Sequence, residues 1–205
     1  MSTAAAPYTL ERTDLRTILT GGITLGAIAV LGVVVFALLS RGIGGRAGVI
    51  LESVVVLAGG ALATLLPAGV IRPRSIDAIG WTALTGFLGA VVFTFADLVA
   101  LRPLSIYSWK WDAIGGGSGW WYIPIWWMGS TFLAWMGGWA YSVRARNREQ
   151  VATLQLALQT TGLAVIIFAG LVITRLAPFH SAVAGLGSAL SAVIMVPVTA
   201  LLNRR

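Results

Sequence analysis

The sequence has no cysteine and little charge, and both absences narrow the kinds of protein it can be. Without cysteine the chain has no disulfide and no thiolate to act as a nucleophile or a metal ligand. Charged residues make up only 10% of the chain, against roughly 25% in an average soluble domain. Hydrophobic residues make up 58% and lie in long uncharged runs. The sequence therefore predicts an integral membrane protein.

Other absences limit the chemistry further. His180 is the only histidine, so no pair of histidines has metal-ligand spacing and we expect neither a bound metal nor a haem held by two histidines. No glycine-rich segment ends in the Gly-Lys-Ser/Thr of a phosphate-binding loop, and the residues identify no cofactor. The net charge of +7 comes from short basic clusters between apolar runs. That pattern is typical of loops at a membrane surface, so we expect no nucleic-acid partner.

Six segments are long enough to cross a bilayer, which needs about 20 apolar residues per helix. They cover residues 17–40, 47–71, 78–101, 120–143, 151–174 and 180–202. None alternates apolar and polar residues as the strands of a membrane barrel do. The sequence predicts an all-α, polytopic bundle of about six transmembrane helices at 17–205.

Residues 1–16 are polar and form a separate N-terminal arm, loose or folded as a short surface helix. Thr13 or Asp14 is placed to cap the first helix. A cleaved signal peptide would have an apolar core of about 7 to 15 residues. The first apolar run is longer, so we interpret it as an uncleaved membrane span.

Arginine and lysine residues predict the orientation of the bundle. Nine lie on the side of the termini and five on the opposite side, which together make the 14 in the chain. Because basic residues favour the inner side, both termini should be cytoplasmic, and we expect a bacterial inner membrane. Much of the difference comes from the segment 144–148.

Three helices place an ionisable side chain near the outer surface, below the one long loop at 102–119. Glu52, Asp97 and His180 come from the second, third and sixth spans. Intramembrane acids often mark functional sites, so the two carboxylates are candidate ligand anchors. Two alternatives stay open: His180 simply begins its helix, or the acids pair with nearby basic residues. Those residues are Arg41, Arg46, Arg102 and Arg175.

The long loop and the start of the next span hold six of the nine tryptophans, within 109–127. Candidate ligand-binding residues here are Trp109, Trp111, Asp112, Trp120, Trp121 and Trp127. Tryptophans also gather at membrane interfaces without binding a ligand. The spacing of Trp120, Trp127, Trp135 and Trp139 predicts one broad helix face. That face would contact lipid, another subunit, or a cationic or aromatic ligand.

Small residues predict close helix contacts in two spans. Gly22 and Gly26 form a GxxxG pattern in the first span. In the sixth, Gly185 and Ala189 continue a row that starts at Ser181, with Ala184, Ser188 and Ala192 beside it. These rows would serve packing within the chain or assembly with other membrane subunits.

Three functions fit these patterns. The first is a small binding or transport protein with an outward-facing aromatic pocket, a cationic, aromatic or lipid-like ligand, and partner subunits in the bilayer. In outline this architecture resembles the substrate-binding membrane subunits of energy-coupling-factor vitamin importers, although no vitamin-specific motif is present. The second is a non-catalytic accessory subunit of a respiratory or photosynthetic complex. The third is a membrane enzyme acting on a lipid or prenyl substrate, with Glu52 or Asp97 as proton donor. No residue spacing requires the enzymatic role.

Overall fold

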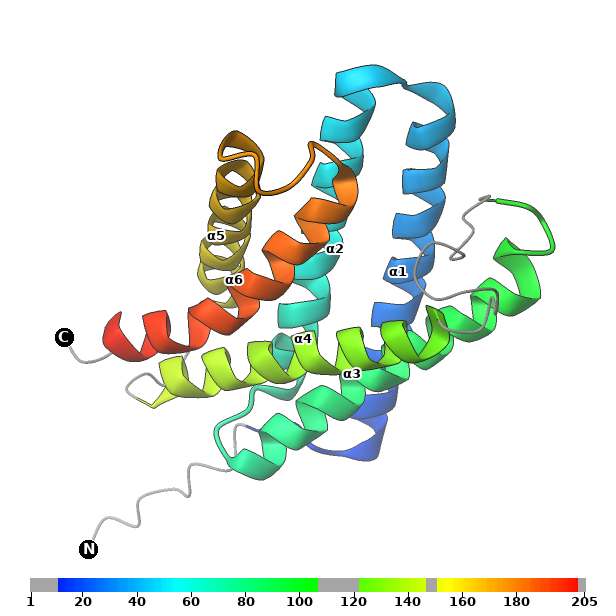
Figure 1. The fold of residues 1–205 in the computed structure, drawn as a ribbon. Coiled ribbons are helices and arrows are strands. Elements are labelled where there is room, and N and C mark those ends of the chain that lie inside the picture. The colour runs from blue at the N-terminus through cyan, green and yellow to red at the C-terminus, as the bar shows by residue number, and fades with distance from the viewer. Residues whose placement is uncertain (1–10, 107–121, 147–150, 203–205) are drawn as a thin grey trace, which may run out of the picture.

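The computed structural model describes residues 11–106, 122–146 and 151–202, and these residues form helices and no strand (Figure 1). The elements are α1 (Leu15–Gly42), α2 (Gly45–Ile71), α3 (Ile76–Ala96), the π-helical turn η2 (Asp97–Leu101), α4 (Tyr122–Ala145), α5 (Thr153–Ile173) and α6 (Ser181–Leu202). The all-helical prediction is confirmed. Each boundary lies within two residues of its predicted position, with α3 and η2 together forming the third predicted span.

Five helical segments are long and apolar enough to cross a membrane: α1, α2, the continuous α3–η2 segment, α5 and α6. The fourth predicted span, α4, is not among them, because its tryptophan, glycine, serine and tyrosine residues lower its mean hydropathy. Its 24 residues extend about 36 Å at about 1.5 Å per residue, enough for a hydrocarbon core of about 30 Å. It also packs against α2, α3 and α6. The bundle therefore combines five apolar helices with one aromatic helix of sufficient length.

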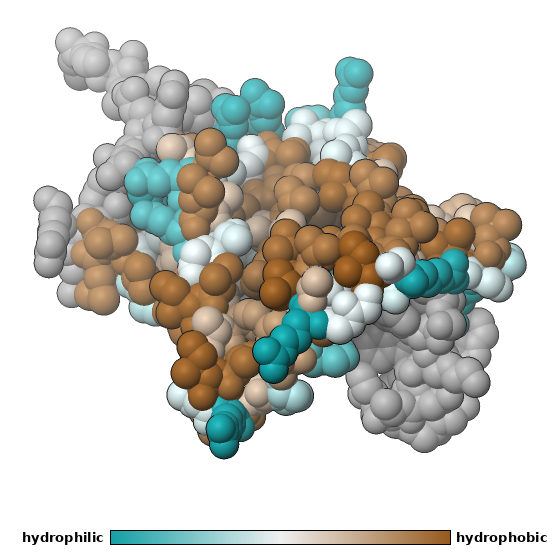
Figure 2. Space-filling model, turned by 90° about the horizontal axis from the view of Figure 1, so that it is seen from above, coloured by the Kyte–Doolittle hydropathy of each residue, from teal (hydrophilic) through white to brown (hydrophobic). Residues whose placement is uncertain are grey.

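The central helix is α2, which contacts each of the other five helices. α1, α3 and α4 pack on one side of it, and α5 and α6 form a hairpin on the other (Figure 1). The α5–α6 hairpin meets the rest of the bundle mainly through α2 and through contacts of α6 with α4. On the face shown in Figure 2, hydrophobic residues cover a broad area and hydrophilic residues form separate patches around it. Exposed large hydrophobic residues on each of the six α-helices suit a lipid environment.

The glycine pattern of α1 lies against α3 of the same chain. A Cβ atom added to Gly26 would lie 2.6 Å from the Val92 side chain, and one added to Gly22 would lie 2.7 Å from Leu88. In α6 the buried small residues include Ser181, Ala184, Ser188 and Ala192 of the two predicted rows. Gly185 and Ala189 are only partly buried, and a Cβ on Gly185 would lie 3.7 Å from Val56 of α2. The structure thus places the GxxxG pattern in internal packing.

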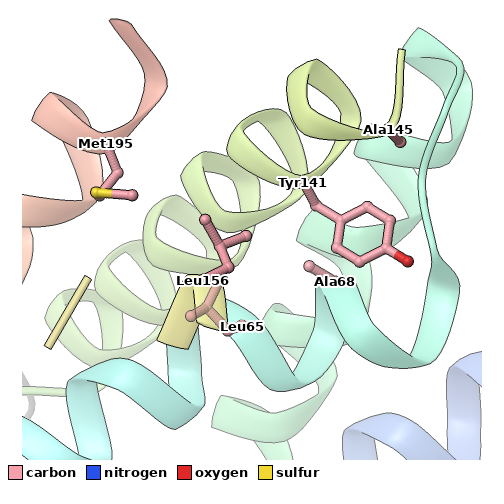
Figure 3. Packing of buried hydrophobic residues seen from close by; sticks show 6 residues of the cluster. All are labelled: Leu65, Ala68, Tyr141, Ala145, Leu156 and Met195. Carbon is pink, nitrogen blue, oxygen red and sulfur yellow. The ribbon is translucent and has the colours of Figure 1, made fainter. Parts of the chain in front are cut away.

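A hydrophobic cluster joins the α5–α6 hairpin to α2 and α4 at the end of the bundle that holds the α2–α3 turn (Figure 3). We call this end the inner end. The cluster consists of Leu65, Ala68, Tyr141, Ala145, Leu156 and Met195. Beside it, Arg144 Nη1 donates a hydrogen bond to Gln159 Oε1 at 2.8 Å, which links α4 to α5. The hairpin is therefore held at the inner end by both apolar and polar contacts.

The N-terminal segment is also fixed at the inner end. Asp14 caps α1 by accepting a hydrogen bond from the Thr17 backbone N–H at 2.9 Å. Its side-chain and backbone hydrogen bonds with Thr17 hold the pKa of Asp14 below the ordinary value of 3.8. Glu11 accepts hydrogen bonds from the backbone N–H groups of Arg74 and Ser75, both at 2.6 Å. Residues 11–14 are therefore bound to the α2–α3 turn; residues 1–10 lie outside the described part of the chain.

Candidate functional site at the outer end

The outer end of the bundle holds the α1–α2 and α5–α6 connections, and there Glu52 of α2 lies between two other helices. Ser40 of α1 donates a hydrogen bond to Glu52 Oε1 at 2.7 Å, and Ser181 of α6 donates one to Oε2 at 2.9 Å. We call these three residues the Glu52 junction. Within the described residues Glu52 has no ion pair, so neutral hydroxyls rather than the nearby arginines hold this carboxylate.

Asp97 has a different environment. Its side chain is 0% exposed and pairs with Arg102, whose Nε lies 2.9 Å from Asp97 Oδ2. The two residues are five apart, and the backbone N–H of Arg102 donates to the Asp97 carbonyl at 3.0 Å in the π-helical turn. The π turn therefore aligns the guanidinium with the carboxylate. From the sequence, Asp97 could anchor a ligand or pair with a nearby basic residue. The structure has the second arrangement, an ion pair with Arg102.

The end of α1 contacts both Glu52 and the segment that follows the Asp97–Arg102 pair. Ser40 binds Glu52, and the next residue, Arg41, donates from Nη2 to the Ser105 carbonyl at 2.6 Å. Ser105 follows the Asp97–Arg102 pair and has a left-handed backbone, with φ of 52°. Each carboxylate thus has its own partners: Ser40 and Ser181 for Glu52, and Arg102 for Asp97.

Tryptophans of α4 divide between two directions. Trp127 Nε1 donates to Thr94 Oγ1 at 3.1 Å, and its ring packs edge-on against Phe87 with centroids 5.4 Å apart, so it lies against α3. Trp135 and Trp139 are 51% and 44% exposed. Of the predicted tryptophan face, Trp127 therefore contacts α3, whereas Trp135 and Trp139 are exposed. The candidate residues Trp109, Trp111, Asp112, Trp120 and Trp121 lie outside the described residues.

His180 lies at the start of α6 and is exposed. Its Nδ1 accepts a hydrogen bond from the backbone N–H of Ala182 at 3.1 Å, which satisfies a donor at the helix start. The described ranges contain no group of three or more histidine or acidic side chains arranged to hold a metal ion. His180 is thus placed as a capping residue, next in the chain to Ser181 of the Glu52 junction.

A hollow between α2, α5 and α6 contains hydroxyl groups that the sequence did not single out. We call these residues the hydroxyl seam: Thr64 of α2, Thr160 and Thr161 of α5, and Ser188 and Ser191 of α6. The hollow encloses about 160 Å³ of space, including part open to the outside, and does not admit a water molecule. The sequence does contain one signal for this hollow. Glu52, Gly60 and Thr64 are separated by multiples of four residues, which places them along one face of α2.

No protein-family model, curated protein or solved structure matches this chain. The functional argument therefore rests on the residues and contacts described above.

Proposed function

We propose that the protein is a small membrane binding or transport protein that takes a cationic ligand at its outer end, with Glu52 as the anchor. The observation that carries this proposal is the environment of Glu52. A carboxylate within a membrane helix is costly unless it is paired or functional. Here both oxygens accept hydrogen bonds from serine hydroxyls, and no ion pair joins Glu52 to a described residue. A bound cation would supply the opposite charge.

The position of Glu52 also supports a role in binding. Its partners come from α1 and α6, so a ligand that competes with Ser40 or Ser181 changes the contacts of three helices at once. Such a change couples binding to a movement of helices, which a transporter requires. Asp97 has no comparable role in this proposal, because Arg102 already supplies its counter-charge.

The test is the unfolding midpoint of the detergent-solubilised protein in chloride salts of sodium, methylammonium, propylammonium and choline at one ionic strength. A ligand present at 100 times its Kd stabilises the folded state by about 2.7 kcal/mol, which corresponds to a rise of roughly 5–10 °C for a chain of this size. We expect at least one cation to raise the midpoint of the wild type but not of Glu52→Gln.

Asp77→Asn is the matched control, because Asp77 is an exposed acid in the first turn of α3 at the inner end. This variant should keep the cation-dependent rise. If no cation raises the wild-type midpoint, or if Glu52→Gln responds as the wild type does, Glu52 is not a cation anchor.

An accessory role in a larger membrane complex is the second candidate, and the outward face of α4 favours it. Met128, Phe132, Trp135 and Trp139 are exposed along this face. Aromatic residues and methionine are enriched in protein interfaces. Under this function, Trp135→Ala combined with Trp139→Ala should release co-purifying subunits from gently extracted protein, whereas Glu52→Gln should not. Retention of the same subunits by the double variant counts against this face as the interface.

A further inference from the structure

We propose that the contact surface between α2 and the α5–α6 hairpin is a binding cleft for a small protonated amine, closed in this structure by the Glu52–Ser181 hydrogen bond. The proposal rests on the proposed function, since Glu52 lies at the entrance of the cleft. It adds the location of the site, the part of the molecule that moves, and the chemical class of the ligand.

A line of contacts between α2 and α6 runs from Glu52 towards the hydroxyl seam. Glu52 binds Ser181 at 2.9 Å, Val56 lies opposite Gly185, and Gly60 lies against Ser188. A Cβ atom on Gly60 would lie 2.5 Å from Ser188 Oγ, so the glycine allows this serine to reach the α2 backbone. Because the α2 residues are four apart, the acid and the seam lie on one helix face.

The hydroxyl seam offers hydrogen-bond acceptors. Thr64 donates its hydroxyl hydrogen to the Gly60 carbonyl at 2.7 Å, and Thr160 donates to the Leu156 carbonyl at 2.8 Å. Ser188 and Ser191 also donate to carbonyls of their own helix, at 3.1 and 2.9 Å. Since these hydrogens are already donated, the oxygen lone pairs remain to accept.

Acceptor oxygens below a carboxylate define the class of ligand. A protonated amine carries a positive charge for Glu52 and N–H groups that donate to hydroxyl oxygens. An anion would be repelled by Glu52 and would find no free hydroxyl donor among the four bonded members of the seam. A small amine is therefore the complement of this surface.

The two ends of the hairpin are held differently, which indicates how the cleft opens. At the inner end Leu156 and Met195 are buried in the hydrophobic cluster, and Gln159 is bound to Arg144. At the outer end the contacts with α2 are fewer: Ser181 binds Glu52 through one hydrogen bond, and a smaller cluster packs Leu57 against Ala164 and Ala184. An amine that pairs with Glu52 competes with that bond, so we infer that the hairpin pivots about its inner end and exposes the seam.

The experiment uses single cysteines, because the natural chain has none. Ser191→Cys reports on the seam, and Thr82→Cys is the matched control, since both side chains are fully buried and Thr82, in α3, is not among the residues that line the hollow. Each is labelled with two membrane-impermeant thiosulfonates of similar size, one bearing trimethylammonium and one bearing sulfonate. Adding Ser181→Ala removes the closing hydrogen bond and leaves Glu52 in place.

We expect Ser181→Ala to raise the labelling rate of Ser191→Cys by about tenfold, since a hydrogen bond to a charged group is lost. The rate of Thr82→Cys should not change, and the trimethylammonium reagent should react faster than the sulfonate reagent at Ser191→Cys. Propylammonium chloride should protect this cysteine, and sodium chloride at equal concentration should not. Ser188→Cys replaces Ser191→Cys if the latter does not fold.

Several results would overturn the proposal. One is that Ser181→Ala does not raise the labelling rate of Ser191→Cys, or raises that of Thr82→Cys equally. Another is that the sulfonate reagent reacts faster than the trimethylammonium reagent at Ser191→Cys. A third is that sodium and propylammonium protect this cysteine equally. The two proposals fail separately. If Glu52→Gln keeps the cation-dependent stabilisation while Ser191→Cys is labelled at the expected rates, Glu52 is not the anchor but the proposed cleft is supported. If the stabilisation depends on Glu52 but Ser181→Ala does not raise the labelling rate of Ser191→Cys, the proposed cleft is wrong and the anchor is supported.

Discussion

Replacing Gly137 with alanine should destabilise the bundle strongly, because α4 approaches the α2 backbone at this residue. An added Cβ would lie 1.7 Å from the Thr64 carbonyl oxygen and 2.6 Å from the carbonyl carbon. Both are backbone atoms of a helix, so no side chain can rotate away to make room. The helices would have to separate at Thr64, which belongs to the hydroxyl seam.

The expected cost lies at or above the top of the usual range for an overpacked site. Such substitutions cost about 1–3 kcal/mol and occasionally more, so we expect at least about 3 kcal/mol. For a chain of this length that loss lowers the thermal midpoint by roughly 6–12 °C. The midpoint is measured by circular dichroism in mild detergent. Gly129→Ala in the same helix is the control, because an added Cβ meets nothing within 4 Å. A Gly137→Ala variant that unfolds at the wild-type midpoint would refute the close approach of α4 and α2.

Three further changes test other parts of the fold. Leu156→Ala removes a fully buried side chain from the inner cluster and should cost about 2–5 kcal/mol in the free energy of unfolding; a loss below about 1 kcal/mol contradicts this packing. Asp97→Asn weakens a buried ion pair and should cost about 2 kcal/mol, yet it should keep any cation-dependent stabilisation, whose loss would make Asp97 part of the site. The lowered pKa of Asp14 means that its stabilising effect is present above pH 3.8 and lost as the pH falls through the lowered value. The difference in midpoint between wild type and Asp14→Asn should therefore narrow below pH 3.8, and a constant difference would contradict the assigned cap.

The helices were predictable because a membrane span is defined by length and composition, which the sequence displays directly. The sequence offered Thr13 or Asp14 as the cap of α1 from their residue types before an apolar run, and the structure has Asp14. The π turn at Asp97 was not predictable, since the sequence around it reads as an ordinary helix end. Its geometry brings Arg102 to the buried carboxylate.

The partners of Glu52 show why the candidate site was only partly predictable. The sequence places Glu52 near the outer surface, but depth does not fix the direction of a side chain about the helix axis. Nearby arginines were the expected partners, whereas the packing of α1 and α6 against α2 brings Ser40 and Ser181 instead. Trp127 illustrates the same limit, since its spacing suggested a shared face and its contacts lie on α3.

The measurement that tests the central claim most directly is native mass spectrometry of protein extracted gently from its own membrane, with wild type compared to Glu52→Gln. The account predicts that the wild type carries a defined small mass of an amine-containing compound and that the variant does not. Asp77→Asn, at the opposite end of the bundle, should keep that mass. A wild type without any bound small molecule, or a Glu52→Gln variant that retains the same mass, would contradict Glu52 as the ligand anchor.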